Sequence, residues 1–213
     1  MRHSLGFFGG STAATSGGTS VLTHSLPMTD GGLDAVRATL DHMVKIVRKY
    51  RSDQTTAETA RRILVAGGIQ DLRQQRRQAI TLLQNWVRDN IVYVYDPTEV
   101  EWIQTPPKTL SLGTGDCDDK IVLLLAMLES VGFNTEFLAV GGEGKGWDPS
   151  CAPAAPSMLP AYSHVLGAVR FGSVTGKLPP FLDGWLWLET IVKNANPGYK
   201  PPGIRVIMPR RVS

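Results

Sequence analysis

The first clear pattern in the chain is that of a helix with one apolar face. After residue 33, apolar side chains recur three and four positions apart, and basic side chains occupy the positions between them. This spacing predicts an amphipathic helix whose charged face meets solvent. Its apolar stripe comprises Leu33, Val36, Leu40, Met43, Val44 and Val47.

Two further helices are predicted before the first strand. One covers residues 56–66, and Gly67-Gly68 after it provides a signal for a helix end. The other runs from Asp71 to about Asn90 and carries its own apolar stripe. The first part of the chain is therefore expected to be helical.

Strand character begins at Ile91, where β-branched and aromatic residues alternate up to Asp96-Pro97. Residues 99–108, which contain Pro106-Pro107, are predicted to form an ordered loop. Later strands are predicted over residues 135–140, 163–171, 184–191 and 204–208, with the second and third as antiparallel neighbours. Helices followed by a further helix and several strands are typical of the α+β class.

The stretch from residue 109 to 132 organises the chain. Its apolar residues Ile121, Leu124, Leu125 and Leu128 have the spacing of an amphipathic or fully buried helix. Two glycines and the capping residue Asp116 precede this helix, so it is expected to begin at or beside Cys117. The positive end of a helix stabilises a thiolate.

Two carboxylates, Asp118 and Asp119, flank Cys117 and oppose that stabilisation. A reactive thiol here would need a cationic partner. His3 and His24 lie in the N-terminal segment and His42 lies on the amphipathic helix, whereas His164 begins a predicted strand. We therefore take His164 as the candidate base.

The next predicted strand ends at Glu189, so antiparallel pairing would bring this carboxylate to the same end of the sheet as His164. Cys117, His164 and Glu189 then form a candidate set of nucleophile, base and orienting acid. Asp183 is the reserve candidate for the acid. The strand's alternation places Glu189 on the same face as Trp185.

An acyl-transfer site also needs donors for the developing oxyanion. The backbone N–H of Cys117 is the first candidate, and Gln104 or Trp102, in the preceding segment, is the second. Trp102 is equally well explained as an anchor of the core.

Composition narrows the function classes. The 22 basic and 19 acidic side chains give a net charge of +3, which is low for a protein built around phosphate contacts, so no nucleic-acid partner is expected. No apolar run reaches the roughly eighteen residues of a membrane span, and the leader lacks a secretory core, so a cytoplasmic location is expected. Cys117 and Cys151 form no metal-binding pattern, so neither a metal nor another cofactor is expected, and Cys151 is interpreted as an incidental thiol.

The domain organisation is predicted to be simple. Residues 1–32 are rich in glycine, serine and threonine, which is typical of a flexible arm, although Phe7 and Phe8 keep open an arm that lies along a neighbouring subunit. Residues 33–213 are expected to form a single domain. The unpatterned segment 141–160 is predicted to cover the active-site cleft.

The run from Glu101 to Gly132 resembles the pattern GWxxTPxxTLxxGxGDCxDxxxLLxxxLxxxG of the transglutaminase-like superfamily, which has a papain-type fold. The resemblance covers about residues 70–200. It implies a cysteine at a helix start, a histidine on a later strand and an acid on the next, which correspond to Cys117, His164 and Glu189. The chain departs from the family where Glu189-Thr190 stands in place of the usual aspartate.

Two functions follow from this resemblance. The first is thiol-dependent acyl transfer on an amide carbonyl of a protein or peptide, by hydrolysis or by transamidation, as in proteases, amidases and glutamine cross-linkers. The second is a non-catalytic structural or assembly protein that keeps the fold, like compact members encoded by bacteria and their tailed phages. The second would give the protein a virion role and an assembly partner for its N-terminal arm.

Overall fold

The structure is a computed structural model that describes residues 25–26, 33–96, 101–142, 162–171 and 184–213. The predicted segment 141–160 lies almost wholly outside this described part of the chain, as does most of the predicted arm. The assignment of residues 33–213 to a single domain stays a prediction.

The four predicted helices are present in the described residues in the predicted order, together with one helix over residues 106–112 that the sequence did not predict. They are α1 (Leu33–Tyr50), α2 (Gln54–Ala66), α3 (Arg76–Asn90), α4 (Pro106–Leu112) and α5 (Cys117–Ser130). Helix α2 begins two residues earlier than predicted because the Asp53 side chain accepts the backbone N–H of Thr56 at 3.0 Å.

Helix α3 begins five residues later than predicted. The Asp71 carboxylate accepts the backbone N–H groups of Arg73 and Gln74, at 2.8 and 3.4 Å. These bonds fold the segment into a turn that competes with the helix.

The segment predicted as a loop over residues 99–108 is in part regular structure, so that prediction is wrong. Strand β3 (Glu101–Trp102) pairs antiparallel with β1 (Ser25–Leu26), and α4 starts at Pro106. Proline at the first position of a helix loses no hydrogen bond, which is why Pro106-Pro107 begins a helix here. The strand predicted at residues 91–95 is shorter in the structure, where β2 covers only Val92–Tyr93. It pairs in parallel with β4 (Thr114–Gly115).

Four strands form the main sheet, which has the order β7-β6-β5-β8 and is antiparallel throughout. They are β5 (Thr135–Gly142), β6 (His164–Arg170), β7 (Trp185–Leu188) and β8 (Ile204–Arg211). The predicted antiparallel neighbours, β6 and β7, do pair. Together with the helices this confirms the α+β class.

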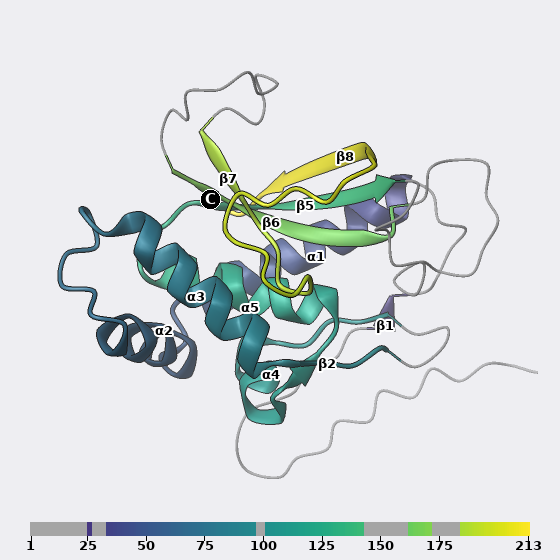
Figure 1. The fold of residues 1–213 in the computed structure, drawn as a ribbon. Helices are drawn as coiled ribbons and strands as arrows, with labels where there is room; N and C mark the ends of the chain where they lie inside the picture. Colours follow the sequence, from purple (N-terminus) through teal and green to yellow (C-terminus); the bar gives the residue numbers. More distant parts are fainter. Residues whose placement is uncertain (1–24, 27–32, 97–100, 143–161, 172–183) are drawn as a thin grey trace, which may run out of the picture.

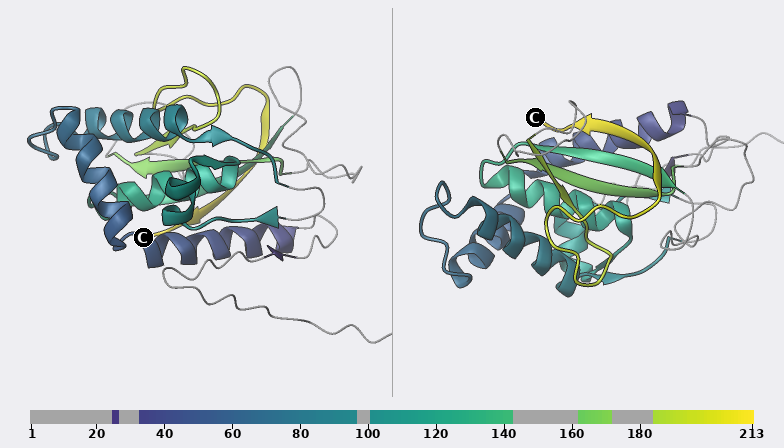
Figure 2. Two further views of the ribbon diagram at one scale, coloured as in Figure 1. Left: turned by 90° about the horizontal axis from the view of Figure 1, so that it is seen from below. Right: turned by 45° about the horizontal axis from the view of Figure 1, so that its top comes forward.

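Helix α5 is the centre of the fold. All residues from Asp118 to Leu128 are buried, because α1, α2, α3 and α4 surround the helix and the sheet covers it from the other side (Figures 1 and 2). The helix is thus buried on every side, which is the second of the two arrangements that its periodicity allows.

Helix α5 approaches β6 closely at Gly167. A Cβ atom there would lie 2.8 Å from side-chain carbons of both Ile121 and Leu125. Glycine therefore sets the distance between the helix that begins with Cys117 and the strand that begins with His164.

The sheet separates two apolar clusters. The large core lies on the α5 side, and a smaller cluster on the other face contains Leu138, Val140, Leu166, Ala168, Trp185 and Trp187. This follows from the alternation of side chains along a strand. Within the described part of the chain, the helices lack the length and apolarity needed to cross a membrane.

Candidate active site

The backbone at the start of α5 is held by reciprocal capping. The Asp116 side chain accepts the backbone N–H groups of Asp118 and Asp119, at 3.0 and 3.1 Å. The Asp119 carboxylate in turn accepts the N–H of Asp116 at 3.4 Å. This arrangement is a capping box. It confirms that Asp116 is the N-cap and that the helix begins at Cys117.

The Asp119 carboxylate also ties the helix start to the preceding segment. It accepts the backbone N–H and the side-chain amide N–H of Gln104, at 2.6 and 2.7 Å. Asp119 is fully buried, and burial raises its pKa to about 7 although the N–H groups of Gln104 and Asp116 lower it. Gly115 makes room for this carboxylate, since a Cβ atom there would lie 2.6 Å from the Asp119 Cβ.

Cys117 is half-buried and packs against the large core. Its Sγ lies 3.4 Å from Oδ1 of Asp118. A carboxylate at this distance opposes formation of a thiolate, as the sequence indicated. An activated thiol here requires a positive charge nearby.

His164 and Glu189 are in direct contact. Nε2 of His164 lies 2.9 Å from Oε2 of Glu189, and the other carboxylate oxygen of Glu189 accepts the backbone N–H of Ile191 at 2.7 Å. Burial alone would raise the pKa of Glu189, but the hydrogen bond and charge of His164, with the nearby backbone N–H groups, lower it below its usual value. The second ring nitrogen of His164, Nδ1, is buried and has no hydrogen-bond partner among the residues that the structure describes.

The backbone after Glu189 is tied to α3, which fixes the position of the carboxylate. The carbonyl oxygen of Ala195 accepts hydrogen bonds from Gln84 at 2.8 Å and from Arg88 at 2.9 Å. The N–H of Gly198 donates to the carbonyl of Trp187 at 2.7 Å. Residues 189–198 therefore form a loop that is anchored at both α3 and β7.

Lys120, in the first turn of α5, is bonded to the end of α3. Its Nζ donates to the carbonyl oxygens of Ile91 and Arg88 at the end of α3, at 2.6 and 3.2 Å. Burial lowers the pKa of Lys120 to about 8, while the charges of Asp89 and Glu189 act in the opposite direction. The charge of Glu189 therefore reaches the first turn of α5.

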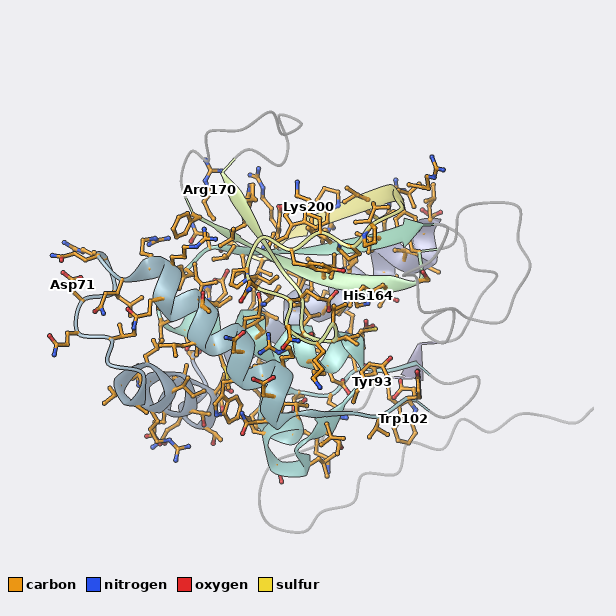
Figure 3. All side chains as sticks on the ribbon, in the orientation of Figure 1. Asp71, Tyr93, Trp102, His164, Arg170 and Lys200 are labelled. Atoms are coloured by element: carbon orange, nitrogen blue, oxygen red, sulfur yellow. The ribbon has the colours of Figure 1, made fainter. Side chains whose placement is uncertain are left out.

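Figures 1 and 2 show α5 under the sheet, with its N-terminal end toward the end of β6 where His164 is labelled in Figure 3. The structure thus joins His164 to Glu189 and places the helix that begins with Cys117 against the strand that begins with His164.

The two candidate oxyanion residues differ in their surroundings. The amide nitrogen of Gln104 donates to Asp119 and lies 3.4 Å from the Thr114 carbonyl oxygen, so in this structure it braces the turn. Trp102 is 43 % exposed and is therefore no core anchor. A role in stabilising an oxyanion stays a prediction for both residues. Asp183 and Cys151 lie outside the described residues.

Sequence reasoning missed the roles of Asp119 and Lys120. The spacing of Asp116 and Asp119 resembles that of a capping box and could have shown the first role. No local signal points to the second, because the Lys120 partners lie about thirty residues away, at and just after the end of α3. In the described part of the chain, no group of three or more histidine, cysteine or acidic side chains has the arrangement of a metal site.

Residues 64–171, just over half of the chain, match the family model described as "Transglutaminase-like superfamily". The chain therefore belongs to the transglutaminase-like superfamily, and its α+β fold is that of this family.

No curated protein matches the sequence. One similar solved structure is a protein of Parabacteroides distasonis that is named a "putative protease", with 18 % sequence identity and a TM-score of 0.46. The match covers 73 % of this chain and 26 % of that one, so the chain spans about a quarter of the length of its structural neighbour.

Proposed function

We propose that the protein is a thiol-dependent acyl-transfer enzyme that acts on amide carbonyls of a protein or peptide. The observation that carries this proposal is the pairing of His164 Nε2 with the Glu189 carboxylate at 2.9 Å, which leaves the buried Nδ1 as the ring nitrogen available to a thiol. Cys117, at the start of the central helix in this family fold, supplies that thiol.

In the proposed mechanism, the Sγ of Cys117 attacks the amide carbonyl carbon while His164 takes the thiol proton. The imidazolium that forms is stabilised by the charge of Glu189, which also fixes the tautomer of the ring. His164 then gives its proton to the leaving amine, and a thioester remains on Cys117. Water or a second amine resolves the thioester, which gives hydrolysis or transamidation.

The backbone N–H of Cys117, at the N-terminus of α5, is the proposed first donor to the oxyanion. The capping box and Asp119 hold this part of the backbone fixed, so the donor is oriented before substrate arrives. Preorganised donors of this kind account for much of the rate enhancement in acyl transfer.

A second candidate function is a non-catalytic assembly protein that keeps the fold, as in a phage virion. One observation favours it, namely the Asp118 carboxylate 3.4 Å from the thiol, which stabilises the protonated form of Cys117. An assembly protein has no need of an activated thiol. The two functions therefore differ in the reactivity of one sulfur atom.

Alkylation by iodoacetamide across the pH range distinguishes the two functions, with the modified cysteine located by peptide mass mapping. We expect Cys117 to react faster than Cys151 at pH 6, since an imidazolium beside a thiol holds part of it as thiolate. His164→Ala should remove this advantage, whereas the matched change His42→Ala on α1 should keep it. Equal rates for the two cysteines at pH 6 in the wild-type protein would contradict the enzymatic proposal.

A further inference from the structure

Several exposed apolar side chains lie on or just after the short strands beside the turn that begins α5, where Val92 and Val94 alternate with Tyr93 and Tyr95. Val92, Val94, Tyr95 and Trp102 are 62, 49, 53 and 43 % exposed. Single exposed apolar residues are ordinary on a protein surface, but a group of them beside a candidate active site is typical of a binding surface.

Three aromatic residues lie beside this turn, namely the exposed Tyr95 and Trp102 and the partly buried Tyr93, and we call them the aromatic cluster. The rings of Tyr93 and Tyr95 meet edge to face, with centroids 4.9 Å apart. The backbone N–H of Trp102 donates to the carboxylate of Asp96 at 2.5 Å, which brings β3 against the residue that follows Tyr95. Figure 3 shows Tyr93 and Trp102 in the same region of the molecule.

The aromatic cluster is attached to the backbone around Cys117 on two sides. On one side, Tyr93 is the register partner of Gly115, and the N–H of Val94 donates to the Gly115 carbonyl at 3.2 Å. On the other side, Gln104 follows Trp102 by two residues and is bonded to Asp119 in the first turn of α5. The cluster is therefore held at a fixed place relative to the nucleophile.

We propose that the aromatic cluster binds an aromatic side chain of a peptide substrate, close to the amide that Cys117 attacks. The position next to the reacting amide rests on the proposed function. Aromatic rings pair edge to face and bury large apolar areas, so exposed tyrosine and tryptophan side chains suit such a partner. The exposed part of the cluster consists of the aromatic side chains of Tyr95 and Trp102, so apolar contact is the main source of recognition.

A competition experiment on the full-length protein tests this proposal without turnover. Cys117 is alkylated by iodoacetamide in the presence of one of two blocked heptapeptides, one made only of glycine and the other with a central phenylalanine. Glycine on both sides of the phenylalanine lets the peptide bind to the aromatic cluster in any register. We expect the phenylalanine peptide to give the same protection at about a tenfold lower concentration, the advantage expected for one well-packed aromatic pair.

Trp102→Ala and Tyr95→Ala should each reduce this advantage, and because both side chains are exposed the changes should leave the melting temperature nearly unaltered. The matched control is Val65→Ala, which removes an exposed apolar side chain on α2 and should keep the advantage. Equal protection by the two peptides, no protection by either, or an advantage that survives both aromatic replacements would overturn the proposal.

The outcomes also separate this proposal from the proposed function. Even an unactivated thiol is alkylated at high pH, so protection reports peptide binding whether or not Cys117 is a nucleophile. If Cys117 were alkylated slowly at pH 6 but still protected by the phenylalanine peptide, acyl transfer would be contradicted and the proposed peptide-binding surface would be supported. A fast Cys117 without selective protection would keep acyl transfer and overturn the aromatic specificity.

Discussion

The first turn of α5 and the residue that follows β7 each hold a buried carboxylate, and the pKa values of these two carboxylates are shifted in opposite directions. Asp119 is fully buried and Glu189 is 1 % exposed, and each accepts hydrogen bonds from N–H groups. Yet the pKa of Asp119 is raised to about 7, whereas that of Glu189 is lowered.

The difference comes from the charge of the partners. Asp119 meets only neutral amide donors, and the nearby Asp96 repels its negative charge, so burial prevails. Burial would raise the pKa of Glu189, but an imidazole that can carry a proton, together with the backbone N–H groups of Ile191 and Val192, outweighs it. Burial alone thus does not decide whether an acid is ionised, and the two carboxylates suit different tasks. Asp119 braces the backbone, and Glu189 serves as an electrostatic partner.

The largest predicted effect is the loss of catalytic activity when the negative charge of Glu189, directly after β7, is removed. Glu189→Gln keeps the shape and a hydrogen bond to His164 but cannot stabilise the imidazolium. We expect kcat/KM on a peptide amide to fall by about 10⁴-fold, by analogy with the orienting carboxylate of serine proteases, while the fold is kept. Circular dichroism checks the fold.

Asp183→Asn is the matched control for Glu189→Gln, because Asp183 was the reserve candidate for the acid. It should change kcat/KM little. A large loss with Asp183→Asn and a small one with Glu189→Gln would reverse the assignment of the acid.

The next effect concerns the turn before α5. Gly115→Ala places a methyl group 2.6 Å from the Asp119 Cβ, a helix atom that cannot move away without shifting the backbone. We expect a loss of about 1–3 kcal/mol in the free energy of unfolding, or more if the bonds to Gln104 are lost. Urea unfolding measures the change.

Gly113→Ala sharpens this comparison, because Gly113 has a φ of 66° and nothing within 4 Å of a Cβ atom. Its cost should be limited to about 1 kcal/mol of backbone strain. If Gly113→Ala were as costly as Gly115→Ala, steric contact with Asp119 would not explain the need for glycine at residue 115.

The last prediction concerns the pH dependence of stability. Between pH of about 4 and 7 the folded chain keeps a proton on Asp119 that the unfolded chain releases, so this group makes stability fall as pH rises, by at most about 1.4 kcal/mol per pH unit. Glu136, whose pKa burial also raises to about 7, acts in the same direction. Asp119→Asn should therefore flatten the decline in the melting temperature over this range without abolishing it.

The contribution of Glu189 to stability changes with pH in the opposite direction. Its pKa is lowered, so the stability it adds is present above the usual glutamate pKa of about 4.3 and is lost as pH falls. Glu189→Gln should alter the pH dependence only in that acidic range.

A wild-type stability that rises between about pH 4 and 7 would show that the N–H donors around Asp119 outweigh its burial.

Much of the fold follows from local signals in the sequence. The apolar spacing from Ile121 to Leu128 predicts α5, and Asp116 fixes its first residue, because caps and periodicity act over a few neighbouring residues. Local signals predict the wrong structure where one residue type suits two kinds of structure. Pro106-Pro107 was interpreted as a loop, although proline also suits the first turn of a helix.

The sequence predicted which residues belong to the candidate site better than it predicted the contacts that they make. Strand alternation predicts that Glu189 shares a face with Trp185, but β7 ends at Leu188, so this placement stays a prediction. Glu189 nevertheless meets His164, because it directly follows β7, the antiparallel neighbour of β6. The exposure of Trp102 was not predictable, because an aromatic residue beside a short strand suits both a core and a surface.

By itself, the sequence determined where the central helix begins, which thiol stands at its N-terminus and the α+β order of elements, since these depend on neighbouring residues. Only the tertiary structure decided which carboxylate meets the imidazole, that Gln104 braces Asp119, and that Lys120 is held by the end of α3. Each of these contacts joins residues 15 or more positions apart. Their formation depends on strand register and on how closely Gly167 lets α5 approach the sheet.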